Sequence, residues 1–165
     1  MFERVEYDGP GEAESMASIK QQNRHLFYLV HPANAQYRTD LPAYYITSAS
    51  PDMIGNIKLQ ASKSLLQKVE FKAFLSAGKT SSSDQLFNDD SQETLFEVKP
   101  KWKGGQYQWI DSAGKKIAHE EGKVEHKLVI SAPITQQTQD ALVALWVLKI
   151  WHDTLETRAA KREGK

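Results

Sequence analysis

Hydrophobic positions are most concentrated near the C-terminal end of the chain. From Ala141 to Trp151, Lys149 is the only polar residue, and the surrounding pattern predicts a helix over about 136–157. A surface helix has one apolar stripe, whereas a helix that is apolar on all sides has to be enclosed. We therefore predict a central helix surrounded by the other elements. Its expected core residues are Leu142, Leu145, Trp146, Leu148 and Trp151.

This apolar run is too short to cross a membrane. The segment from Ala141 to Trp151 spans roughly 16 Å at about 1.5 Å per residue, whereas the hydrocarbon core of a bilayer is about 30 Å thick. The next residues turn polar, beginning with His152 and Asp153. We therefore expect no transmembrane segment, and we expect the helix to leave the protein interior near His152.

Upstream of the helix, apolar and polar residues alternate as they do in strands with one buried face. The clearest runs are 57–62 and 68–75. The best hairpin joins 106–110 to 115–119 through a turn that ends in Gly114. Further strands are expected near 26–30, 44–46, 96–98 and 128–132, with a short additional one near residues 2–7. Eight or nine antiparallel strands followed by one helix predict a mainly β fold, a closed or nearly closed barrel that encloses the hydrophobic C-terminal helix.

The ends of the chain differ from its middle. Residues 1–18 carry five acidic side chains and one arginine, so we expect a flexible acidic tail there. Residues 19–158 are expected to form a single barrel domain, and residues 159–165 a charged C-terminal tail.

Composition removes several functional classes. The chain has no cysteine, which excludes disulfides, thiolate catalysis and cysteine-bound metals. Lysine plus arginine equal aspartate plus glutamate at 21 each, so no overall charge favours nucleic acid. The first 20 residues contain no apolar stretch of the kind found in signal peptides, and we expect a cytoplasmic protein, in solution or peripheral to a membrane.

Two segments carry a resemblance to a known superfamily. The hairpin Tyr107–Ala118 and the segment Lys127–Ile134, which leads into the apolar helix, resemble the tubby C-terminal-like superfamily of tubby, LURP-one-related and phospholipid-scramblase proteins. The second segment is similar to uncharacterised fungal proteins of this type. The resemblance covers roughly the last 60 residues. It implies a barrel around a C-terminal helix and a non-catalytic binding or scaffold module that recognises anionic phospholipid or a protein through its outer loops. The tubby phosphoinositide-binding residues match no positions here, and the cysteine-rich and calcium-site features of scramblases are absent.

One loop has the composition of a lipid-headgroup interface. Lys99, Lys101 and Lys103 surround Trp102 beside two glycines. Lysines attract anionic lipid, and tryptophan suits the boundary between water and hydrocarbon. These four residues are the predicted anion-binding site. The alternative is a tight turn whose Trp102 folds back onto the barrel.

Two histidines are weak candidates for a metal site. His119 and His126 lie near several carboxylates on one hairpin, and imidazole with carboxylate suits zinc or manganese. An ordinary solvated turn explains the same residues. We expect no cofactor, and no catalytic motif argues for an enzyme.

Two alternatives to the leading hypothesis remain open. The first is a small-ligand or metal-binding protein, or an enzyme, with a pocket at the helix exit that uses His119, His126 or Trp151. The second is an open sheet whose helix plugs one end, as in pleckstrin-homology-like adaptor domains. A monomer is favoured in each case.

Overall fold

The computed structural model describes residues 2–6, 22–63, 68–88, 90, 92–101, 106–122 and 124–163. The strands among them are β1 (Phe2–Glu6), β2 (Gln22–Val30), β3 (Tyr45–Ser48), β4 (Gly55–Lys63), β5 (Val69–Ala77), β6 (Glu93–Pro100), β7 (Tyr107–Asp111), β8 (Lys116–Glu121) and β9 (Lys127–Ile130). A short 3-10 helix, η1 (Ala35–Tyr37), precedes β3, and one long helix, α1 (Gln136–Glu163), follows β9.

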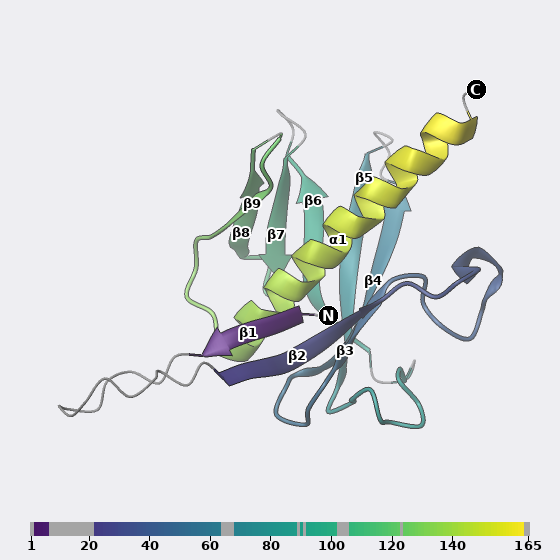
Figure 1. Ribbon diagram of the computed structural model, residues 1–165. Helices are drawn as coiled ribbons and strands as arrows, with labels where there is room; N and C mark the ends of the chain where they lie inside the picture. The colour runs from purple at the N-terminus through teal and green to yellow at the C-terminus, as the bar shows by residue number, and fades with distance from the viewer. Residues whose placement is uncertain are drawn as a thin grey trace.

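The strands form one antiparallel sheet in which each strand pairs with the next one in sequence. Figure 1 shows β4 to β9 on one side of α1, while β1, β2 and β3 run across the start of the helix. The prediction of a mainly β fold with a C-terminal helix is confirmed. Closure of the barrel is not seen, because β1 and β9 are the two ends of the described sheet and do not pair with each other.

Both predicted tails contain regular structure. Residues Phe2–Glu6 of the expected acidic tail form β1, which pairs with β2. At the other end, α1 continues to Glu163 and so runs into the expected charged tail. Among the residues that the structure describes, no helix is both long enough and apolar enough to cross a membrane.

Alternating residues of the sheet form the core with one side of α1. The inward side chains of the central strands are buried together with those of the helix. They include Ile57, Leu59, Phe71, Ala73, Phe96, Val98, Trp109, Leu142, Leu145 and Leu148. Burial of each large apolar side chain contributes roughly 1.5–3 kcal/mol to folding, so this cluster accounts for the position of α1.

The helix is covered on one side and open on the other. Leu142, Leu145 and Leu148 are fully buried as predicted, and Trp146 is partly buried against the core. The prediction that Trp151 belongs to the core is wrong: it is 36% exposed, and Val147 one turn earlier is 38% exposed. The physical reason is the open sheet, which covers the face of α1 that carries the leucines but does not close over the opposite face.

Candidate functional site

A cleft lies where β3 and β4 separate. These strands share only two register pairs, Ile46 with Ile57 and Tyr45 with Lys58. Next to the second pair, the N–H of Leu59 donates a hydrogen bond to the carbonyl of Tyr44 at 2.9 Å. Pro42 lies just before β3 and has no N–H to donate to a ladder, so the segment that leads into β3 does not pair as a strand. Strand β4 nevertheless continues to Lys63. The sheet therefore opens beyond Tyr44.

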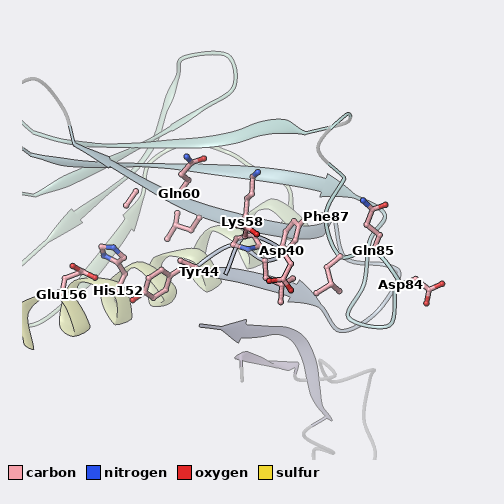
Figure 2. Close-up of a pocket in the computed structure, with 16 residues that line it drawn as sticks. Asp40, Tyr44, Lys58, Gln60, Asp84, Gln85, Phe87, His152 and Glu156 are labelled. Atoms are coloured by element: carbon pink, nitrogen blue, oxygen red, sulfur yellow. The ribbon is translucent and has the colours of Figure 1, made fainter. Parts of the chain in front are cut away.

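This opening is a cleft of about 920 Å³. Its walls are formed by part of β4, by two non-strand segments and by the end of α1 that leaves the core (Figure 2). The lining residues are Thr39–Tyr44, Lys58–Ala61, Asp84–Phe87, His152 and Glu156. Its volume is at the upper end of the range for small-ligand sites, which is about 300–1,000 Å³.

Carboxylates outnumber cations in the lining of this cleft. The lining contains three carboxylates, those of Asp40, Asp84 and Glu156, but one lysine, Lys58, and one histidine. Asp40 is paired with the guanidinium of Arg38, whose Nε donates to it at 2.9 Å. Within the described part of the chain, neither Asp84 nor Glu156 forms an ion pair. The lining therefore carries more negative than positive charge.

Aromatic rings form the floor of the cleft. The imidazole of His31 stacks on Tyr44 at 4.2 Å between ring centroids, and that of His152 meets Tyr44 at 4.9 Å and Phe71 at 5.0 Å. Burial raises the pKa of the Tyr44 phenol, and the negative charges of Glu156 and Asp153 raise it further. Tyr44 therefore keeps its proton at neutral pH and presents a neutral, rigid surface to a ligand.

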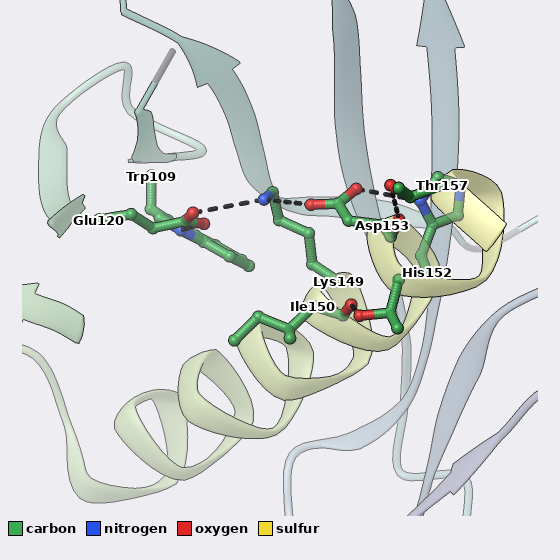
Figure 3. Close-up of polar contacts among 8 residues, drawn as sticks. Trp109, Glu120, Lys149, Ile150, His152, Asp153 and Thr157 are labelled. Atoms are coloured by element: carbon green, nitrogen blue, oxygen red, sulfur yellow. Dashed lines mark hydrogen bonds and ion pairs between the residues drawn. The ribbon is translucent and has the colours of Figure 1, made fainter. Parts of the chain in front are cut away.

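A buried ionic group, here called the Lys149 cluster, lies behind this floor. It consists of Lys149 with Glu120 and Asp153, whose carboxylates accept hydrogen bonds from the ammonium group at 3.3 Å and 2.9 Å (Figure 3). The same ammonium lies over the ring of Tyr107. The indole N–H of Trp109 donates to Glu120 at 3.2 Å, which fixes the orientation of that carboxylate.

A bulge in the sheet brings Glu120 to the helix. Trp109 pairs with Ala118 and Ile110 with Lys116, so Ile117 is an additional residue in β8. Ile117 and Ala118 are both buried, and Glu120 then falls on the same face as Ala118. Without this extra residue, the alternation along β8 could not place both Glu120 and the buried residues of the strand on the face that lies toward α1.

The Lys149 cluster and the cleft meet at His152. Its Nδ1 lies 3.2 Å from a carboxylate oxygen of Asp153, while its ring lines the cleft. Burial alone would raise the pKa of Asp153, but the hydrogen bond with His152 and the charge of Lys149 outweigh this and lower it. The ammonium group of Lys149 is thus engaged by two carboxylates and the ring of Tyr107.

The predicted anion-binding loop is only partly described. Lys99 forms an ion pair with Glu97 at 2.6 Å, and Lys72 lies 3.4 Å from the same carboxyl group. These contacts hold the pKa of Glu97 below its usual range. The carbonyl of Lys101 accepts a hydrogen bond from the ammonium of Lys68 at 3.5 Å. Trp102 and Lys103 lie outside the described residues.

The structure does not bring the candidate metal ligands together. His119 contacts Glu121 through Nε2 at 3.1 Å, and no hydrogen-bond partner for its buried Nδ1 is found among the described residues. His126 is exposed in the turn before β9. In the described ranges, no group of three or more metal-ligating side chains is arranged to hold an ion.

The cleft reaches the exit of α1, but the α1 residues that line it differ from those expected at this place. Trp151 does not line the cleft; it meets the floor from the side, with its ring 5.8 Å from that of His31. The lining residues of α1 are His152 and Glu156. Lys149, His152 and Glu156 follow one another at spacings of three and four residues, which places them along one side of a helix. This spacing was the available signal in the sequence.

Comparisons with protein-family models, with curated proteins and with solved structures find no match to this chain.

Proposed function

We propose that this chain is a non-catalytic binding module of the tubby-like kind, whose cleft between β3 and β4 holds a polar ligand with a positive charge. One observation carries the proposal: the cleft opens where the sheet separates, and two of its carboxylates, those of Asp84 and Glu156, have no ion-pair partner among the described residues. The ring of Tyr44 in the floor supports it further, because the face of a tyrosine ring attracts cations.

A titration with a minimal cation tests this proposal. The probe is N-acetylarginine amide, and its neutral control is N-acetylcitrulline amide, which has nearly the same shape. Backbone amide signals of Tyr44, Gln60 and Phe87 should shift with the cation at a Kd on the order of 1 mM, as expected for a ligand of this size. The citrulline compound should bind several-fold more weakly.

Two matched variants locate the charge that matters. Glu156→Gln should weaken binding of the arginine compound severalfold, whereas Glu125→Gln, in an exposed turn, should leave it unchanged. Equal binding of the two compounds would overturn the proposed charge selectivity. Shifts confined to amides outside the cleft, or no shifts at all, would overturn the cleft as the binding site.

A second candidate function is recognition of an anionic phospholipid surface by a basic end of the molecule. The hydrogen bond from Lys68 to the carbonyl of Lys101 brings the start of β5 next to the end of β6. Figure 1 shows α1 projecting past the strands at this same end, and its last turns carry exposed Arg158, Lys161 and Arg162. Each basic residue near an anionic surface contributes about 1 kcal/mol.

Flotation with phosphoinositide-containing vesicles at low and high salt tests this second candidate, with pure phosphatidylcholine vesicles as control. Binding should decrease at high salt and should be lost when Lys99, Lys101 and Lys103 are all replaced by glutamate. Binding that is unchanged in this triple variant, or the absence of salt-sensitive binding, would remove the candidate.

A further inference from the structure

We infer that the ligand of the cleft is an extended peptide segment that carries a basic residue and pairs through its backbone with the open edge of β4. This inference rests on the proposed function of the cleft and names the class of its partner.

The first support is the unpaired backbone of β4. The N–H of Leu59 points toward β3, where it donates to Tyr44. In an antiparallel ladder, alternate residues direct their backbone groups to the same neighbour, so Ala61 and Lys63 point the same way as Leu59. Neither has a backbone partner on that side among the described residues. Such an edge is a template for an additional strand.

The opposite wall does not compete for this edge. The wall is formed by Thr39–Ala43, which is not a strand and which includes Pro42. Since proline has no N–H, this wall cannot form a regular ladder with β4 or with an incoming segment. A peptide in the cleft would therefore take its backbone hydrogen bonds from β4 alone.

Side chains of the cleft define what the segment should carry. Figure 2 shows the ends of Lys58 and Gln60 pointing away from Tyr44, His152 and Glu156, so the two faces of β4 present different chemistry. Residues of an added strand alternate between these two faces. A basic residue is favoured on the face of Glu156. Its neighbours, on the face of Lys58, should be uncharged or acidic.

A blocked heptapeptide with the sequence Thr-Val-Thr-Arg-Thr-Val-Thr provides the test. It should bind the full chain at least about tenfold more tightly than N-acetylarginine amide, because backbone pairing adds to the charge contact. Binding should also slow hydrogen exchange at the amides of Ala61 and Lys63. A peptide with glutamate in place of arginine should lose most of this affinity, and equal binding would overturn the preference for a basic residue.

N-methylation supplies a matched control for the ladder. Methyl groups on one set of alternate peptide nitrogens should abolish binding, since those nitrogens face β4, while methyl groups on the other set should be tolerated. Equal effects of the two sets would overturn strand addition. The variant Ala61→Pro removes one edge donor and should weaken binding of the peptide by a larger factor than binding of N-acetylarginine amide. If that variant does not fold, the two N-methylated peptides still test strand addition.

The results distinguish a failure of the peptide partner from a failure of the cation-binding cleft. If N-acetylarginine amide binds the cleft, but the peptide binds no more tightly and leaves the exchange of Ala61 and Lys63 unchanged, the partner class is wrong and the cleft remains a cation site. If neither probe perturbs the cleft, both are wrong.

Discussion

The ammonium group of Lys149 lies 3.7 Å from the centroid of the Tyr107 ring. The lysine side chain is only 2% exposed, and it reaches Glu120 and Asp153 from the same position. A desolvated cation over an aromatic face is stabilised by about 2 kcal/mol. The C-terminal half of α1 is therefore held to β7 and β8 by charge as well as by apolar contact.

Removal of the positive charge should destabilise the fold strongly. In Lys149→Met, the carboxylate of Glu120 stays largely buried without its cation, and we expect a loss of about 3 kcal/mol in the free energy of unfolding. Urea denaturation measures this. Lys127→Met is the control, because Lys127 forms an exposed pair with Glu121, and it should cost less than about 1 kcal/mol. Equal effects in both variants would show that the Lys149 cluster does not anchor the helix.

The phenol of Tyr107 should make the fold sensitive to high pH. Burial raises its pKa to about 12, and the charges of Asp153 and Glu120 contribute to this shift. A raised pKa means that the folded state retains the proton longer than the unfolded state, whose value is about 10. The resulting stability is present below pH 10 and is lost as the pH rises toward 12. Tyr107→Phe should flatten this part of the stability curve, and a variant with the same loss as the parent protein would contradict the assignment.

The two sides of α1 should respond differently to a charge. Leu142→Asp places a carboxylate in the core, where nothing compensates its desolvation, and should abolish folding. Val147→Asp places the same group on the open side and should leave a cooperatively folded protein with a Tm within a few degrees of the parent. Thermal unfolding followed by circular dichroism distinguishes them. If Val147→Asp also fails to fold, this side of α1 is covered in solution.

Gly55, the first residue of β4, should tolerate substitution poorly. Its φ is +135°, and an added Cβ would lie 2.3 Å from the carbonyl oxygen of Ser76. Gly114 also has a positive φ, of +79°, but an added Cβ would meet nothing within 4 Å. Gly55→Ala should therefore destabilise the fold by well over the ~1–2 kcal/mol expected from backbone strain alone in Gly114→Ala. Equilibrium unfolding of the two variants side by side decides this.

The strands and the helix were predictable because their periodicity is local. The runs 57–62 and 68–75 follow the alternation that β4 and β5 display, and Thr135 caps α1 by accepting a hydrogen bond from the N–H of Thr138 at 3.2 Å. How far the sheet bends around the helix depends on contacts between distant segments, which no local pattern records. For that reason the local pattern does not reveal that Trp151 is exposed.

The cleft was not predictable for a related reason. Lys149 and Asp153 were recognisable as a pair four residues apart, but their partner Glu120 comes from β8 and is placed by a bulge. Likewise, Pro42 indicates that strand pairing is interrupted. Whether the interruption produces an opening in the sheet depends on the register of β3 against β4. The basic loop is recognisable in the sequence because its charges lie within a few residues of one another. The carboxylates of the cleft come from distant segments, so no local pattern indicates them.

The pairing of each strand with its sequence neighbour has a consequence for biosynthesis. As the chain leaves the ribosome, every strand after the first finds its partner already present, so the sheet can grow in step with translation. Its apolar face, however, is covered by α1, which follows all of these strands in the sequence. Until α1 has been synthesised, the apolar side chains of the nascent sheet, among them Phe71, Phe96 and Trp109, lack the helix that covers them in the folded protein.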